Sequence, residues 1–135
     1  WGNEENFNYT NTADKNSSSR FRDNRWDDGY NYTGPVDSFP KDGSPYGVYV
    51  MMGNVSEWTS NWVDYSKKGD STSYYFNLPT KDPVGPESGY QKITAGNNYN
   101  SSKYFVGLKS MYAPGGSLPD INSGQIGFRC AKDVK

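Results

Sequence analysis

The sequence predicts a single α+β domain in which a few short strands lie beneath long, ordered loops. The length of 135 residues suits one domain. Glycine, proline and asparagine recur every few residues, so turns are expected to dominate over regular structure. Aliphatic residues are scarce, whereas the chain contains 12 tyrosines and 4 tryptophans. We therefore expect a core built largely from aromatic side chains, each of which buries a large area.

Short apolar or alternating stretches mark the expected elements in chain order. They are an extended piece at Val36–Phe39, a buried strand or turn at Val48–Met52, and strands at Ser56–Trp62, Lys92–Ala95 and Ile126–Lys132. In the stretch Ser56–Trp62, Trp58 and Trp62 alternate with polar residues and are expected to point inward. Residues 64–90 are expected to form a long polar loop, and residues 97–125 to be polar and irregular.

Charge and residue counts exclude several classes of function. A net charge of −1 provides no basic field for a nucleic-acid backbone, so no nucleic-acid partner is expected. No apolar run reaches the length of a membrane-spanning helix. The chain has no histidine and one cysteine, Cys130. These counts exclude disulfide scaffolds, most zinc sites and catalytic triads that depend on histidine.

Five motifs, taken together and in order, point to one family. They are Asp27-Asp28-Gly29-Tyr30, Gly34–Pro40, Gly47-Val48-Tyr49, Gly53–Trp58 and Gly127–Cys130. In that order and spacing they resemble the formylglycine-generating enzyme (sulfatase-modifying factor) family. The resemblance implies a C-type-lectin-like fold of that family's subtype, with a small twisted sheet and large surface loops. By this resemblance, residues 1–135 are expected to form one domain that matches about the C-terminal half of a typical family domain. The domain could belong to a longer chain or to an oligomer.

The resemblance also bears on catalysis. Oxidase members of the family carry two cysteines that bind copper, and a count back from Gly127 places these positions at Ser101 and Val106. A serine hydroxyl is a poor ligand for a soft metal, and valine is none. Cys130 is expected to be a small buried thiol in the closing strand. The sequence therefore predicts a domain that is not an enzyme.

Calcium is the metal that the resemblance favours, because calcium takes carboxylate, amide and carbonyl oxygens. The family's first calcium site implies side-chain oxygens from Asn11 and Asp28 and backbone carbonyls from Thr12 and Tyr30. The alternative is purely local, with Asp28 in a simple turn and Asn11 in an Asx-turn. A calcium ion at this site would be structural and would hold loops that a small core cannot hold.

A second calcium site is implied less completely. It would use the carbonyls of Gly53 and Val55 and the carboxylate of Glu57. Three residues before Gly53 the family usually has an oxygen-bearing side chain, and this chain has Val50. The alternative is a helix capping box, because the spacing from Asn54 to Glu57 also fits that motif.

The ligand-binding surface is expected before the closing strand, in residues 97–125, where this fold carries its functional face. Tyrosine interleaved with asparagine, serine and glycine is the composition of adaptable binding loops. The alternative is that the aromatic side chains fill the core. The candidate residues are Asn97, Asn98, Tyr99, Asn100, Ser102, Tyr104, Phe105, Tyr112 and Asn122.

The function expected from these observations is ligand binding by a calcium-stabilised display domain, with a protein or glycan on a cell surface as the partner. Millimolar calcium outside cells suits an oxygen-ligated site, so an extracellular, cell-surface or virion-surface location is expected. The chain also resembles the variable proteins of diversity-generating retroelements, which often carry this domain and vary in the same segment. The alternatives are a structural subunit of a secretion or gliding machine and, less favoured, a divergent enzyme.

Overall fold

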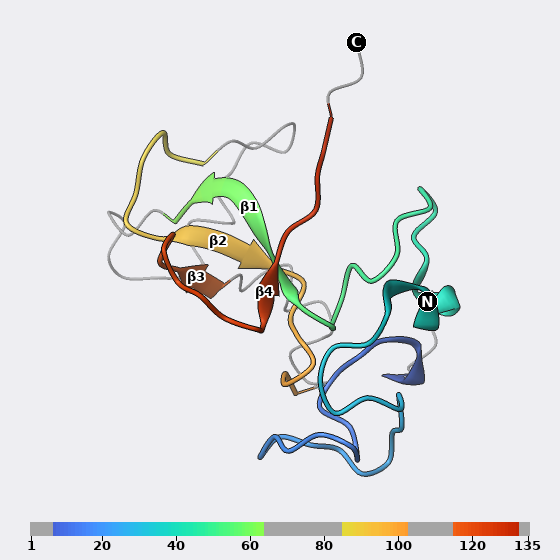
Figure 1. The fold of residues 1–135 in the computed structure, drawn as a ribbon. Coiled ribbons are helices and arrows are strands. Elements are labelled where there is room, and N and C mark those ends of the chain that lie inside the picture. Colours follow the sequence, from blue (N-terminus) through green and yellow to red (C-terminus); the bar gives the residue numbers. More distant parts are fainter. Residues whose placement is uncertain (1–6, 64–84, 103–114, 133–135) are drawn as a thin grey trace.

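The structure is a computed structural model that describes residues 7–63, 85–102 and 115–132 (Figure 1). Four short strands and three single turns of 3-10 helix make up its regular elements. These are η1 (Phe7–Tyr9), η2 (Val36–Ser38), η3 (Pro40–Asp42), β1 (Ser56–Trp62), β2 (Lys92–Ala95), β3 (Gly115–Ser117) and β4 (Ile126–Gly127). A loop-rich domain with few strands is therefore confirmed. Within these ranges there is no α-helix, so the α+β assignment is not confirmed.

The four strands form one sheet in the order β3-β2-β1-β4. Strand β1 runs antiparallel to β2, with Glu57 opposite Ala95 and Trp58 opposite Thr94. The register shifts between Trp58 and Trp62, which is the behaviour of a β-bulge. On its other side β1 pairs in parallel with β4, which places Glu57 opposite Gly127. This pairing brings the closing segment of the chain to the Glu57 end of β1.

The bounds of β1 and β2 agree with the sequence prediction. Tryptophan and threonine favour strands. Trp58 and Trp62 are half-buried, but so are Thr59 and Asn61 between them, and the inward orientation of the tryptophans stays a prediction. At Trp62 the ring is covered by the Lys92 ammonium, whose Nζ lies 4.0 Å from the ring centre. The bounds of β1 could be predicted because the strand is seven residues long, which is long enough for a local sequence pattern to be visible.

Two other expected elements differ from the structure. The Val36–Phe39 stretch forms the 3-10 turn η2 instead of an extended piece, because the Ser38 N–H donates back to the Pro35 carbonyl at 3.1 Å. The closing strand is only two residues long. As a consequence, Cys130 lies beyond the strand and is exposed, so the prediction of a buried thiol is wrong.

A layer of loops from residues 7–55 packs at one end of the sheet (Figure 1). Its centre is the segment Thr10–Asp14, which we call the buried polar segment because all five residues are less than 3% exposed. Elsewhere in the described ranges the buried hydrophobic residues are Phe39, Val50 and Ile93. The expected aromatic core is therefore wrong for this part of the chain, since its most deeply buried side chains are polar.

Backbone hydrogen bonds tie the neighbouring loops to the buried polar segment. The Asn54 N–H donates to the Asn11 carbonyl at 2.8 Å, and the Asp23 N–H donates to the Ala13 carbonyl at 2.9 Å. Such bonds satisfy the buried peptide groups that would otherwise destabilise the fold. Across the described ranges, no helix has the length and apolar character needed to cross a membrane.

Candidate functional site

The Asp28 carboxylate joins the two loops predicted to form the first calcium site. Its Oδ2 accepts a hydrogen bond from the Thr12 N–H at 3.0 Å, and its Oδ1 accepts one from the Tyr30 N–H at 2.8 Å. Asp28 is therefore brought to Thr12 and Tyr30 through their N–H groups, and Asn11 immediately precedes Thr12 in the chain. Each carboxylate oxygen has a further lone pair beyond the one used by the peptide N–H.

Asn11 is fully buried and has one unsatisfied atom. Its side-chain nitrogen donates to the Tyr32 carbonyl at 2.8 Å and to Asn54 Oδ1 at 3.2 Å. Both contacts are acceptors, so the orientation of the amide is fixed. Its Oδ1 is buried and has no hydrogen-bond partner among the described atoms. An orphaned buried acceptor costs about 1–3 kcal/mol, and a bound cation would remove that cost.

The local electrostatics also fit a cation. Burial, with a smaller contribution from the nearby Asp14 carboxylate, raises the pKa of the Asp28 carboxyl to about 6. Asp14 is 1% exposed, and its Oδ2 accepts the Asp28 N–H at 2.5 Å. The donors are all hard oxygens, which is the chemistry of calcium. Since the described ranges hold no cluster of three His, Cys, Asp or Glu side chains, such a site would depend on amide and carbonyl oxygens as well.

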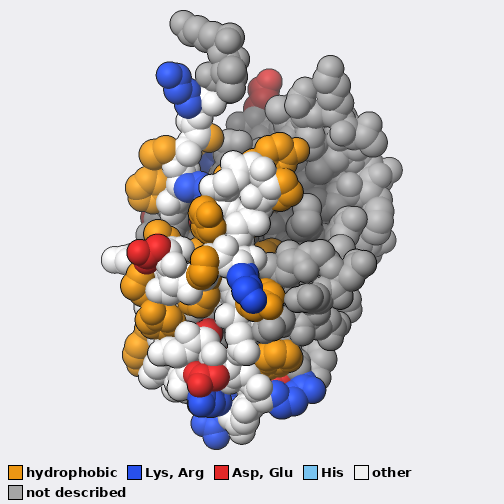
Figure 2. All heavy atoms as spheres, turned by 90° about the vertical axis from the view of Figure 1, so that its right-hand side faces the viewer, with side chains coloured by type: hydrophobic (Ala, Val, Ile, Leu, Met, Phe, Trp, Pro, Cys, Tyr) orange, Lys and Arg blue, Asp and Glu red, His pale blue; other side chains and the backbone are white. Residues whose placement is uncertain are grey.

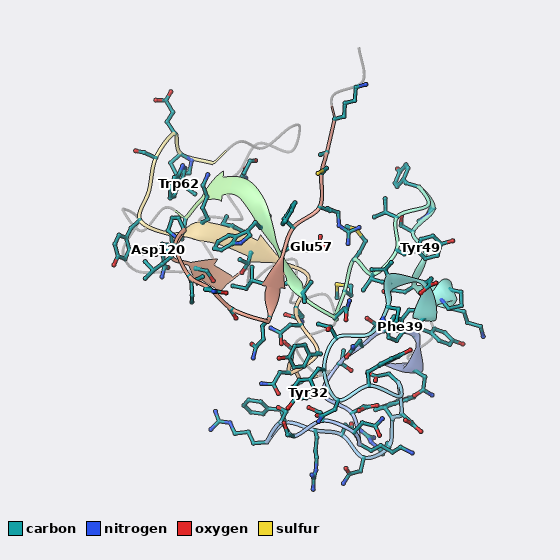
Figure 3. All side chains as sticks on the ribbon, viewed as in Figure 1. Tyr32, Phe39, Tyr49, Glu57, Trp62 and Asp120 are labelled. Atoms are coloured by element: carbon teal, nitrogen blue, oxygen red, sulfur yellow. The ribbon has the colours of Figure 1, made fainter. Side chains whose placement is uncertain are left out.

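Glu57, the carboxylate of the predicted second calcium site, lies on β1 (Figure 3) and forms an ion pair with Arg129. Arg129 Nε donates to Oε2 at 2.6 Å, and Nη2 donates to Oε1 at 2.5 Å. The same guanidinium donates to the Tyr49 carbonyl at 3.2 Å and to the Val50 carbonyl at 3.0 Å. A metal ion would have to compete with this guanidinium, so Gly53, Val55 and Glu57 as calcium ligands stay a prediction.

The capping-box alternative for the same stretch is wrong. Asn54 has a φ of 60° and is followed by strand β1 instead of a helix. Its side chain instead fixes the loop at Gly34, accepting the Gly34 N–H at 2.9 Å and donating to the Gly34 carbonyl at 3.2 Å.

Replacing Arg129 with methionine is expected to lower the free energy of unfolding by about 2 kcal/mol, because Glu57 and two carbonyls lose their donors. Replacement by lysine keeps the charge but not the planar fork, and about 1 kcal/mol is expected. Urea denaturation measures both. Arg22→Met is the control, since this exposed arginine forms no ion pair within the described ranges, and equal losses for Arg22→Met and Arg129→Met would contradict the assignment.

The predicted binding segment is only partly described. Tyr104, Phe105 and Tyr112 lie outside the described residues, and Asn122 is exposed on the connection between β3 and β4. Asn97, Asn98, Tyr99 and Asn100 are half-exposed, whereas Ser102 is buried. Three hydrogen bonds fasten this stretch to three other loops. They are Ala13 N–H to Ser101 O (3.0 Å), Tyr99 N–H to Asn54 O (2.9 Å) and Ser19 Oγ–H to Asn100 O (3.1 Å).

Sequence reasoning missed several surface residues beside this segment. The Tyr99 ring makes an edge-to-face contact with Tyr32, with ring centres 5.7 Å apart. A separate pocket of about 260 Å³ is lined by four residues of the loop layer, namely Val36, Asp37, Pro40 and Tyr49. Exposed aromatic residues inside polar loops were the only sequence signal for either feature.

The position predicted to replace the first copper thiolate has a local role. Ser101 Oγ accepts the Asn98 N–H at 3.2 Å and helps to close a turn. A hydroxyl in this position does not fit a copper-thiolate centre. The second position, Val106, lies outside the described residues.

Comparison with known proteins gives consistent matches. The profile of a family described as sulfatase-modifying factor enzyme 1-like domain matches residues 1–134. Formylglycine-generating enzyme of Mus musculus is 37% identical over 110 residues, covering 82% of this chain and 27% of the relative. The enzyme of the same name from Streptomyces coelicolor is 36% identical over 111 residues, again with 82% of this chain and 32% of the relative. The chain thus spans about a third or less of these relatives.

Two further similarities come from proteins with other names. Serine/threonine-protein kinase Pkn1 of Chlamydia trachomatis is 37% identical over 103 residues, which are 76% of this chain and 15% of that protein. The structure of PvdO from Pseudomonas aeruginosa is similar with a TM-score of 0.58 and 27% identity. It covers 76% of this chain and 34% of that chain.

These relatives contradict the prediction that the chain is not an enzyme. Four of them, at 34–37% identity, are named formylglycine-generating enzyme. The prediction rested on two aligned positions, and the absence of a thiol at two positions does not exclude chemistry carried by other residues. The resemblance to variable proteins of diversity-generating retroelements stays a prediction.

Proposed function

Because this chain belongs to the family of sulfatase-modifying factor enzyme 1-like domains, we propose that it forms the ligand-binding, calcium-ordered part of an enzyme domain of the formylglycine-generating type. The ligand is a polypeptide, since the formylglycine-generating relatives belong to a family described by its action on sulfatases, which are proteins. The binding surface is the segment 97–102 together with the loops that contact it.

The observation that carries this proposal is how firmly that segment is held. Its backbone is bonded to three separate loops, at Ala13, Ser19 and Asn54, while Asn97–Asn100 keep half-exposed side chains. A surface whose backbone is fixed before binding loses little conformational entropy on binding. Tyrosine and asparagine then provide rigid contact area and adaptable hydrogen bonds.

Calcium is the second part of the proposal. The buried, unpaired Asn11 Oδ1 and the desolvated Asp28 carboxylate support a cation there, with the Thr12 and Tyr30 carbonyls as further ligands. The ion would offset the charges of Asp28 and neighbouring Asp14 and fix the loops that support the binding surface. Millimolar calcium outside cells suits such a site, and we place the protein there.

Selection from a random peptide library on the immobilised protein tests the binding function. We expect enriched peptides to bind the protein saturably and to bind Tyr99→Ala at least about tenfold more weakly, because tyrosine anchors commonly contribute about 2 kcal/mol at interfaces. Tyr46→Ala is the matched control, since Tyr46 is 92% exposed and lies on another loop. The proposal would be contradicted if the library yields no saturable binder, or if the selected peptides bind Tyr99→Ala as tightly as the unchanged protein.

A further inference from the structure

A group of exposed side chains adjoins the binding segment at the end of the loop layer that lies away from the sheet (Figure 1). Phe21 is 47% exposed and Tyr32 is 61% exposed. Arg20 lies over the Phe21 ring, with its guanidinium carbon 4.6 Å from the ring centre. Together with Tyr99, these residues form what we call the arginine–aromatic patch.

The patch is one surface because its three segments are bonded to each other. The Ser18 N–H donates to Asn31 Oδ1 at 3.2 Å, next to Tyr32. The Ser19 hydroxyl donates to the Asn100 carbonyl at 3.1 Å, next to Tyr99. The ring contact between Tyr32 and Tyr99 joins the remaining two segments. The loops around residues 18–32 lie at the bottom of Figure 1 and are thus held against the binding segment.

The charge of the patch is positive and unneutralised. Arg25, on the same loop, is bonded through two nitrogens to Asp23 at 3.0 and 2.8 Å. Arg20 and Arg22, by contrast, form no ion pair with any residue in the described ranges, and both are exposed. Lys and Arg side chains gather at this end of the molecule in Figure 2. Among the described residues, Arg20 and Arg22 are therefore unpaired cationic side chains at this end of the loop layer, and Arg20 lies directly on an aromatic ring.

We propose that the arginine–aromatic patch binds an acidic polypeptide segment in which carboxylates flank an apolar side chain. The inference rests on the proposed function, because it specifies the ligand chemistry of that binding surface. The N–H edge of the Arg20 guanidinium is free to hold a carboxylate in two parallel hydrogen bonds. The rings of Phe21 and Tyr32 provide the apolar surface for the central side chain, and tyrosine and arginine are frequent hot-spot residues.

The ring geometry favours a polypeptide over a sugar. A sugar stacks on an open aromatic face, but one face of Phe21 is covered by Arg20. Tyr32 and Tyr99 are inclined at 75° to each other, so one ring covers part of the other. What stays open is a set of ring edges and partial faces, against which a phenylalanine or leucine side chain packs in ordinary edge-to-face contact.

Fluorescence anisotropy with the whole chain tests this directly. The probe is a short dye-labelled peptide in which Asp and Glu flank a central Phe. Two control peptides carry Asn and Gln in place of the acids, or Ala in place of Phe. We expect saturable binding of the probe that weakens about tenfold in Arg20→Gln, since a charge-assisted bidentate pair commonly contributes about 1.5–3 kcal/mol. A loss of similar size is expected in Tyr32→Ala, and both control peptides should bind more weakly than the probe.

Matched variants separate this result from general electrostatics. Lys41→Gln removes the same charge from a side chain that lies over Tyr9, outside the patch, and should change affinity less than twofold. All four patch side chains are exposed or half-exposed, so the variants are expected to fold, and a retained calcium-dependent melting temperature verifies this. The inference is overturned if the probe does not bind, if Arg20→Gln weakens binding no more than Lys41→Gln, or if a heparin oligosaccharide binds the patch in place of the probe. Peptides from the random library that bind through Tyr99 but lack acids would overturn the acidic specificity and leave the proposed function standing.

Discussion

Replacing Gly53 with alanine is expected to destabilise the protein by about 4 kcal/mol or more, a loss that only a few mechanisms produce. Gly53 has a φ of +79°, a conformation that side chains disfavour. A Cβ there would lie 2.2 Å from the Asn11 carbonyl oxygen and 2.6 Å from Thr10 Oγ1. Both atoms belong to the buried polar segment, so neither can withdraw without breaking hydrogen bonds of the loop layer. Urea denaturation followed by tryptophan fluorescence measures the loss.

Gly124→Ala is the control for this prediction. Gly124 has no atom within 4 Å of its would-be Cβ and no positive φ. Its replacement is expected to change the free energy of unfolding by less than about 1 kcal/mol, mainly through the unfolded chain. If the two variants were equally stable, the close packing of Gly53 on Asn11 could not hold the loop layer together as the structure indicates.

Calcium added to chelator-treated protein is expected to raise the melting temperature by about 10 °C. A ligand at about one hundred times its dissociation constant stabilises the fold by about 2.7 kcal/mol, and a protein of this size gains roughly 3–4 °C per kcal/mol. In Asp28→Asn the calcium-dependent rise should disappear, because the only carboxylate proposed to contact the ion directly is lost. Asp120→Asn, which removes an exposed carboxylate, should keep the full rise. Differential scanning calorimetry with and without calcium provides the measurement, and a full rise in Asp28→Asn would rule out the site.

The same carboxyl predicts a pH dependence of known sign. Burial raises the pKa of Asp28 to about 6 from an unfolded value of 3.8, so in calcium-free protein the folded state binds this proton more tightly. The associated stability is present below about pH 4 and is lost as the pH rises through 6. We expect a loss of about 1 kcal/mol, because the group is only half-buried and water screens it. The calcium-dependent gain should therefore grow over the same interval of pH, and Asp28→Asn should abolish that growth.

The sequence predicted the sheet better than the loop layer. Strands β1 and β2 have an alternating pattern with tryptophan and threonine, and such local patterns survive in the folded chain. Strand β3 was missed because Gly115–Ser117 has the composition of a turn, and only its pairing with β2 makes it a strand. The turn at Val50 was also ambiguous, because a β-branched residue at φ 54° is stabilised by Arg129, which is 79 residues away.

The site shows the same division between local and long-range signals. The bond of Asp28 to the Tyr30 N–H is local to the motif Asp27-Asp28-Gly29, whereas its bond to Thr12 comes from another loop and was implied only by the family resemblance. The ion pair of Glu57 and Arg129 depends on the parallel pairing of β1 with β4, which no local pattern reveals. Tyr32 was overlooked for a similar reason, since its ring contact is with Tyr99 from a distant segment.

The buried polar segment also determines how the protein responds to temperature. Unfolding normally raises the heat capacity because apolar surface enters water, whereas newly exposed polar surface lowers it. Thr10, Asn11, Thr12 and Asp14 are among the most deeply buried side chains, and aliphatic burial in the described ranges is small. The described ranges therefore contribute little to the heat-capacity change of unfolding, and a small change of this kind broadens the stability curve. A nearly constant stability across a wide range of temperature suits a binding surface whose supporting loops, in the described ranges, are held mainly by buried polar contacts.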